Sequence, residues 1–143
     1  MVQASTFAPE AQGTGRPRLP YVLLTCGALL IPWLTILAST AAPGWLALDS
    51  FEAVGLITTA VLALRAHPAL PVVAAATAAA LLLDAALDLA TSEGTARLAA
   101  VVMALIAELP LAAACAVLAL TAAPAVKAAV TAEVQQPSSR LPR

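Results

Sequence analysis

The chain has 143 residues, of which 62% are hydrophobic and 10% are charged, and its formal net charge is -1 at pH 7. Soluble domains carry about 25% charged residues, so a soluble fold of this length could not bury the apolar surface that this composition produces. The seven lysines and arginines are spread over the predicted loops and chain ends instead of forming a basic patch, which argues against a nucleic-acid partner. We therefore expect an all-helical integral membrane protein whose main partner is the lipid bilayer.

The first half of the chain predicts two membrane spans. Residues 1–18 are polar and interrupted by prolines and glycines, which predicts a flexible cytoplasmic tail. An uncharged apolar stretch follows, and a helix over about residues 20–42 would be about 34 Å long, enough to cross a bilayer. Pro43-Gly44 predicts a turn, after which we expect a second helix at about 45–66.

The second half of the chain predicts two more spans and a tail. A third helix is expected at about 69–91, in an alanine-rich tract whose small side chains let neighbouring helices approach closely. A fourth helix is expected at about 96–123, after a short polar loop, and Pro124 is expected to end it. Residues 124–143 then form a cytoplasmic tail whose first half is expected as a short amphipathic helix on the membrane surface. The predicted transmembrane domain is therefore a four-helix bundle over residues 19–123.

The distribution of basic residues predicts the orientation. Short loops rich in lysine and arginine stay on the cytoplasmic side of a membrane. One side of the predicted bundle collects Arg16, Arg18, Arg65, Lys127, Arg140 and Arg143. The other side has only Arg97. We therefore expect both termini in the cytoplasm and a multi-pass protein of the cell (plasma) membrane.

Five carboxyl side chains fall inside the predicted spans. Asp49 and Glu52 lie three positions apart on the second helix, and Asp84 and Asp88 lie four apart on the third, so each pair shares a helix face. Glu108, on the fourth helix, is expected near the bilayer midplane. An aspartate at the centre of a span costs roughly 2.5–3.5 kcal/mol on insertion scales, whereas each Leu, Ile or Val contributes only about 0.3–0.6 kcal/mol. We therefore expect these five carboxyls to face the interior of the bundle and to form the candidate site.

Three interpretations of this acidic cluster stay open. In the first, the carboxyls brace the bundle or a partner-helix interface, either as protonated groups or through an ion pair with Arg97, which lies at a suitable depth for Asp88. In the second, Glu52, Asp84 and Glu108 line a water-filled pocket open to the outer face, and the protein binds or transports a proton or a cation. In the third, carboxyl pairs catalyse a reaction on a lipid. The chain has no nucleophile motif and no metal signature, so we lean against an enzyme, name no catalytic residue and expect no cofactor.

Charge counting shows that arginines cannot neutralise the cluster. From Asp49 to Glu108 there are six acidic residues and two arginines, and Arg65 is expected at the opposite membrane face. Some of the carboxyls must therefore be protonated, reached by water or matched by an external cation. Each of these conditions predicts a protein that responds to pH.

The acidic segments also carry a resemblance to a family. These segments are Trp45-Leu-Ala-Leu-Asp49-Ser-Phe-Glu52-Ala53, Leu83-Asp84-Ala-Ala-Leu-Asp88 and Ala107-Glu108-Leu-Pro110-Leu-Ala112. Together they resemble an uncharacterised family of small four-helix integral membrane proteins from high-GC Gram-positive bacteria, over most of residues 20–123. The third-helix motif of that family usually carries two aromatic residues between its aspartates, where this chain has Ala86 and Leu87. The resemblance implies the fold and the positions of the carboxyls, and it implies no reaction. So small a bundle also suggests a second copy or another membrane protein as a partner.

Overall fold

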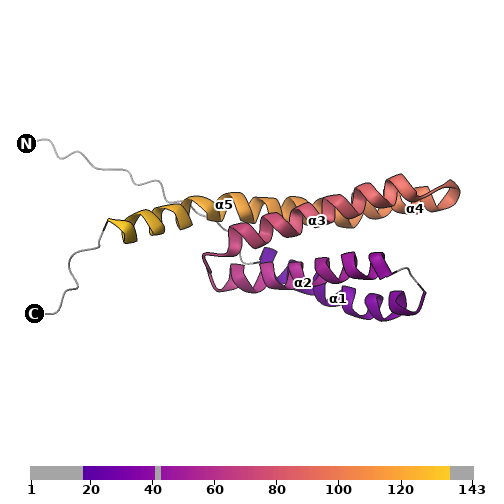
Figure 1. Ribbon diagram of the computed structural model, residues 1–143, viewed down its shortest axis with the longest axis horizontal. Coiled ribbons are helices and arrows are strands. Elements are labelled where there is room, and N and C mark those ends of the chain that lie inside the picture. Colours follow the sequence, from indigo (N-terminus) through magenta and orange to yellow (C-terminus); the bar gives the residue numbers. More distant parts are fainter. Residues whose placement is uncertain (1–17, 41–42, 136–143) are drawn as a thin grey trace, which may run out of the picture.

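The computed structural model describes residues 18–40 and 43–135, and all of its regular elements are helical (Figure 1). The elements are α1 (Arg18–Thr40), α2 (Pro43–Leu64), α3 (Leu70–Thr91), α4 (Gly94–Met103), the π-helical turn η1 (Ala104–Glu108) and α5 (Leu109–Val134). Because α4, η1 and α5 follow one another directly, they form one continuous helix. The described residues thus contain four helices that are long and apolar enough to cross a membrane, which confirms the all-helical prediction.

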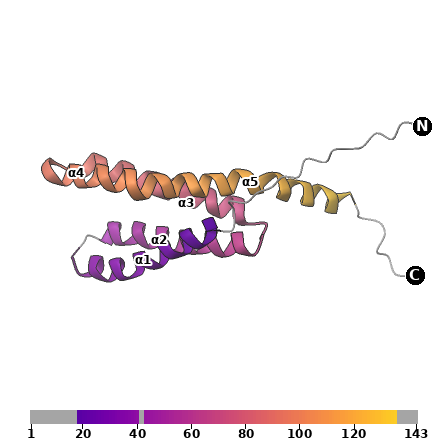
Figure 2. The ribbon, with the colours of Figure 1, turned by 180° about the vertical axis from the view of Figure 1, so that it is seen from behind.

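The helix boundaries differ from the predicted ones at two prolines. Pro43 begins α2 instead of forming a turn, because a proline suits the first turn of a helix, where its missing N–H would have no partner. Pro124 lies inside α5 and does not end it. Its side chain is exposed, and the C-terminal part of α5 extends beyond the other helices in Figures 1 and 2, so the helix can absorb the ring without disturbing packed neighbours. Of the predicted tails over residues 1–18 and 124–143, residues 1–17 and 136–143 lie outside the described residues, and residues 124–134 continue α5.

The four long helices pair as two hairpins. α1 packs along α2, α3 packs along α5, and contact between α2 and α3 joins the two hairpins. In Figures 1 and 2 the start of α1 and the α2–α3 turn lie at one end of the bundle, and α5 leaves the bundle at the same end. The end of α1, the start of α2 and the α3–α4 turn lie at the other. We call these the α2–α3 end and the α3–α4 end.

Glycines allow the close approach of helices at both seams next to α2. A Cβ built on Gly27 of α1 would lie 2.8 Å from Cγ1 of Ile57 and 3.1 Å from the carbonyl oxygen of Ala53. A Cβ built on Gly55 of α2 would lie 2.7 Å from Oγ1 of Thr77 on α3. Neither helix pair could pack this tightly with alanine in place of the glycine, which is the role that small residues have between membrane helices.

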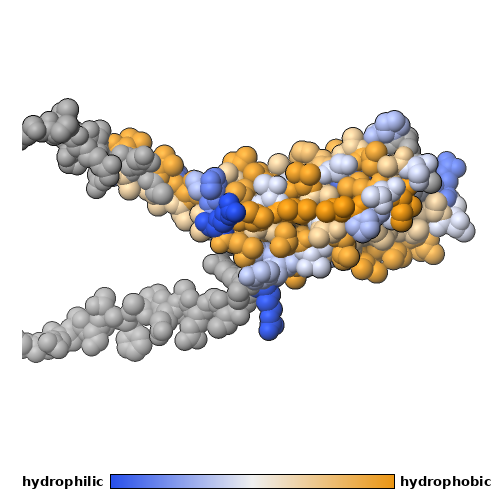
Figure 3. Space-filling view, turned by 90° about the horizontal axis from the view of Figure 1, so that it is seen from below, coloured by the Kyte–Doolittle hydropathy of each residue, from blue (hydrophilic) through white to orange (hydrophobic). Residues whose placement is uncertain are grey.

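A short apolar core ties all four long helices together in the middle of the bundle. Its buried members include Leu23 from α1, Leu56 from α2, Leu81 from α3 and Cys115 from α5. Around it, many large apolar side chains face outward and are more than half exposed, among them Leu29, Val72, Leu98, Ile106 and Leu120. Figure 3 shows that the flank of the bundle is mostly hydrophobic and that hydrophilic residues gather toward its ends. Exposed apolar surface on this scale is rare on soluble proteins, and together with the four apolar helices it indicates a membrane protein.

Candidate functional site

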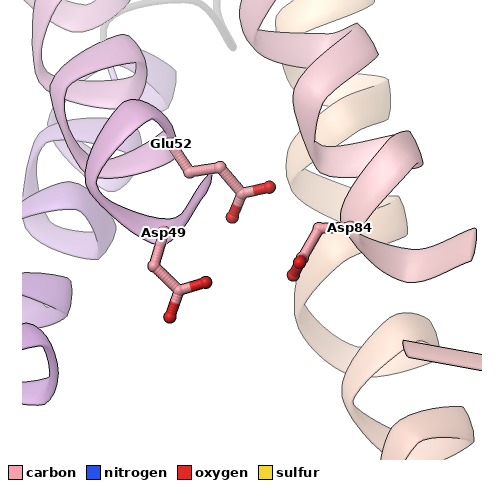
Figure 4. Close-up of side chains that lie close together, drawn as sticks. All are labelled: Asp49, Glu52 and Asp84. Carbon is pink, nitrogen blue, oxygen red and sulfur yellow. The ribbon is translucent and has the colours of Figure 1, made fainter. Parts of the chain in front are cut away.

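Asp49 and Glu52 come from the α3–α4 end of α2. Asp49 lies in the second turn of the helix and is half-buried, and Glu52 follows one turn later with only 4% of its surface exposed. Because residues three apart lie on one helical face, both side chains point to the same side of α2. Figure 4 shows Glu52 reaching from α2 toward Asp84 on the facing helix, with Asp49 beside it. The predicted inward orientation of this pair is therefore found in the structure.

Asp84 and Asp88 come from the last two turns of α3. Asp84 is 8% exposed, and Asp88 is half-buried. The same face of α3 carries Leu81 and Thr77 further from the α3–α4 end, and both of these are buried. The face of α3 that meets α2 therefore changes from acidic near the α3–α4 end to apolar and then to hydroxyl-bearing.

Glu108 is placed by the π-helical turn. The buried positions of this helix run Ala100, Ala104, Glu108 and Ala112, at steps of four residues. In a regular α-helix, eight residues overshoot two full turns by about 80°, so Ala112 would turn away from the face of Ala104. The wider π-helical turn η1 compensates for this rotation, because the Leu109 N–H donates to the carbonyl of Ala104, five residues back. Glu108 is thereby held toward α3 and is 7% exposed.

Pro110 explains why the wider turn occurs at this point. A proline ring clashes with the carbonyl of the residue four positions earlier in a regular α-helix, which here is Ile106. In the structure the π-helical turn directly precedes Pro110, and it ends on the buried carboxyl of Glu108.

All five predicted carboxyls gather in one acidic cluster. One carboxylate oxygen each from Asp49, Glu52 and Asp84 lie within 4.8 Å of one another. One oxygen each from Asp84, Asp88 and Glu108 do the same. Three oxygens of this cluster are buried and have no hydrogen-bond partner among the described residues: Glu52 Oε1, Asp84 Oδ1 and Glu108 Oε2. Buried polar groups normally have partners, so these three oxygens mark the cluster as the candidate site.

Arg97 does not join this cluster. Its side chain is exposed, and no carboxylate among the described residues lies within ion-pair distance of it. The ion pair between Arg97 and Asp88, one form of the bracing interpretation, is therefore not formed in this structure. Arg97 lies in α4 close to the α3–α4 turn, where an exposed arginine keeps its charge in a polar environment.

Trp33 is the neighbour of the cluster that the sequence did not predict. Its indole Nε1–H donates a hydrogen bond of 3.1 Å to Oδ2 of Asp49, which links α1 to α2. Trp33 lies seven residues before the end of α1 at Thr40, and Asp49 lies six residues after the start of α2 at Pro43, so the antiparallel pairing of the two helices sets them nearly opposite each other. An indole N–H inside a membrane needs an acceptor from the protein itself. This need and the register of the two helices are the signals that could have revealed the pair.

The cluster is closed on the side of the α2–α3 end. Leu56 and Leu81 fill the next layer of the α2–α3 seam, and both are almost completely buried. Beyond them the hydroxyls of Thr59 and Thr77 lie 3.3 Å apart. Thr77 donates to the carbonyl of Val73, so Thr59 is the donor to Thr77. An apolar layer thus separates this hydroxyl pair from the carboxyls.

Comparisons of the chain with protein-family models, with curated proteins and with solved structures found no match. The resemblance to the four-helix family therefore stays a prediction, and the functional argument depends on the geometry of the acidic cluster.

Proposed function

We propose that this is a multi-pass protein of the cell membrane that binds a hard cation through the carboxylates of the acidic cluster. The observation that carries the proposal is the set of buried, unpartnered oxygens on Glu52, Asp84 and Glu108. Buried charges are normally paired or coordinate a metal ion. No arginine or lysine among the described residues forms an ion pair with these groups, whereas carboxylate oxygens are the ligands that Ca²⁺ and related cations prefer.

The spacing of the oxygens is compatible with one hard cation shared by each group. Two ligands of one ion lie no further apart than twice the metal–oxygen distance, which is about 4.6–5.2 Å for Ca²⁺ and about 4.0–4.2 Å for Mg²⁺. The oxygens of each group of three carboxylates lie within 4.8 Å of one another, close enough to share one divalent cation. Water molecules would complete the coordination shell from the side of the α3–α4 end.

Orientation supports access from outside the cell. The excess of lysine and arginine at the α2–α3 end, where α1 begins and where α5 leaves the bundle, favours a cytoplasmic location for that end. The acidic cluster then lies in the outer half of the membrane. Since Leu56 and Leu81 close its inner side, we propose a site that takes its cation from outside and holds it, and transport would require α2 and α3 to separate at this layer.

A second candidate function is bracing of the bundle by the carboxyls. The hydrogen bond from Trp33 to Asp49 favours it, because this bond joins α1 to α2 without any cation. Bracing predicts a melting temperature that does not depend on divalent cations. Cation binding predicts that it does, since a ligand that binds only the folded state stabilises it by about 2.7 kcal/mol at a concentration 100 times its Kd.

The test is thermal unfolding of the purified full-length chain in detergent, with EDTA, CaCl₂, MgCl₂ or NaCl at matched ionic strength. We expect CaCl₂ to raise the melting temperature by several degrees, and Glu52→Gln to remove this rise. Glu93→Gln is the matched control, because Glu93 is an exposed acid in the α3–α4 turn whose side chain makes no capping hydrogen bond. A melting temperature that is the same in EDTA and in both divalent salts would reject cation binding and leave bracing.

A further inference from the structure

Asp84 belongs to both groups of converging carboxylates. The first group joins it to Asp49 and Glu52 across the α2–α3 seam, and the second joins it to Asp88 and Glu108 on the side of η1. α3 lies between the two groups because it packs against α2 on one side and against the α4–η1–α5 helix on the other. Asp84 is therefore the ligand that the two groups share, and each group has two carboxylates of its own.

The unpartnered oxygens are divided between the two groups. Glu52 carries one in the first group, Glu108 carries one in the second, and the shared Asp84 carries the third. All three side chains are more than nine-tenths buried. One ion bound in either group would leave the buried oxygen of the other group without a partner, and an unsatisfied buried charged group carries its full desolvation penalty.

Charge balance points in the same direction. The cluster carries five carboxylates, so one divalent cation leaves a net charge of -3 when all five are ionised, whereas two divalent cations leave -1. A residual charge of -3 in the interior of a bundle is strongly unfavourable, because charges removed from water must be compensated locally.

From these observations we infer that the acidic cluster holds two divalent cations at once, with the carboxylate of Asp84 bridging them. Asp49 and Glu52 complete the site on the α2 side, and Asp88 and Glu108 complete the site on the side of η1. Two-metal sites in proteins hold their ions about 3.5–4 Å apart, a distance that a bridging carboxylate spans with one oxygen on each ion. This inference rests on the proposed cation binding and adds the number of ions and the role of Asp84.

Stoichiometry separates the inference from the proposed function. Calorimetric titration of the detergent-solubilised wild-type chain with CaCl₂ is expected to give two ions per chain. One ion per chain would overturn the two-ion site and leave cation binding in place. No binding at all would overturn both.

Two double variants test the assignment of ligands. Asp49→Asn with Glu52→Gln should leave one ion per chain, and so should Asp88→Asn with Glu108→Gln, because each removes one group and spares Asp84. Asp84→Asn alone should weaken both binding steps by at least ~10-fold, in line with losses of about 10–100-fold when even the outer partners of metal ligands are changed. If Asp84→Asn weakens only one step, the bridging role is wrong.

Mn²⁺ provides a test on the wild-type chain that does not depend on the folding of any variant. Two Mn²⁺ ions bridged by one carboxylate couple magnetically, so the electron paramagnetic resonance spectrum at two equivalents should differ from the six-line signal of an isolated ion. Two equivalents that give only the isolated signal would place the ions apart from each other and overturn the bridge. Glu93→Gln serves again as the control and should give the coupled spectrum.

Discussion

Gly55→Ala tests whether the α2–α3 seam sets the geometry of the proposed cation site. The new Cβ would lie 2.7 Å from Oγ1, 3.1 Å from Cγ2 and 3.3 Å from Cβ of Thr77. Thr77 cannot swing away freely, because it is buried and hydrogen-bonded to Val73 and Thr59. We therefore expect α2 and α3 to move apart locally.

The size of the effect follows from these distances. Ordinary van der Waals contact begins at about 3.4 Å, so the helices must separate by about 0.7 Å at this point. Overpacking of this kind costs about 1–3 kcal/mol of stability. Metal sites keep ligand distances within about 0.2 Å, so a displacement of this size, passed along α2 to Glu52, should also lower cation affinity.

The assay is thermal unfolding in detergent with and without CaCl₂, followed by the fluorescence of the two tryptophans. Gly55→Ala should melt at a lower temperature and gain less from CaCl₂ than the wild type does. Gly44→Ala is the matched control, because nothing lies within 4 Å of the added Cβ. The combined variant Gly55→Ala with Thr77→Ala should recover part of the lost stability. If Gly55→Ala is as stable as Gly44→Ala, the seam is not as tight as described.

Three further changes test other parts of the structure. Ala66→Gly should raise thermal stability by about 1 kcal/mol, because Ala66 has a φ of 49° in the left-handed region, and a lower melting temperature would contradict this. Trp33→Phe should lower stability by about 1.5–3 kcal/mol in EDTA, since it removes a donor to the carboxylate of Asp49, and unchanged unfolding would show that the bond contributes nothing. Pro110→Ala should let the π-helical turn revert to an α-helix and turn Glu108 away from α3. Calorimetry should then detect binding of Ca²⁺ that is at least ~10-fold weaker, whereas unchanged affinity would exclude a role for the proline.

The spans and the inward-facing carboxyls could be predicted because each depends on local sequence. Apolar length is enough to identify four helices that could cross a membrane, and spacings of three and four residues place Asp49 with Glu52 and Asp84 with Asp88 on common faces. The penalty for an exposed carboxyl in lipid then gives the direction of those faces. The convergence of these carboxyl pairs with Glu108 depends on how the helices pair, which the local sequence does not determine.

Features that depend on register or backbone irregularity could not be predicted in this way. The bond between Trp33 and Asp49 requires the position of the α1–α2 hairpin turn, and Pro43 shifted that boundary by starting the helix two residues early. The π-helical turn reflects packing of Ala104, Glu108 and Ala112 against α3, which a regular period of 3.6 residues does not anticipate. The course of α5 through Pro124 depends on the exposure of that residue, which becomes known only from the arrangement of the helices.

The two halves of the α2–α3 seam have opposite effects on the contact between α2 and α3. The acidic half drives the two helices apart and the hydroxyl-bearing half holds them together, so cation binding at the acidic half would favour closure of the bundle. Near the α3–α4 end, two ionised carboxylates whose oxygens lie within 4.8 Å of each other repel by about 3.5 kcal/mol or more at an effective dielectric constant of about 20. Toward the α2–α3 end, the hydrogen bond between Thr59 and Thr77 contributes about 0.6 kcal/mol, the average for such bonds between membrane helices. If lipid surrounds both hairpins, burial of Leu56 and Leu81 adds close packing but little hydrophobic driving force. A divalent cation that binds Glu52 and Asp84 together would replace that repulsion with a cross-link between the hairpins.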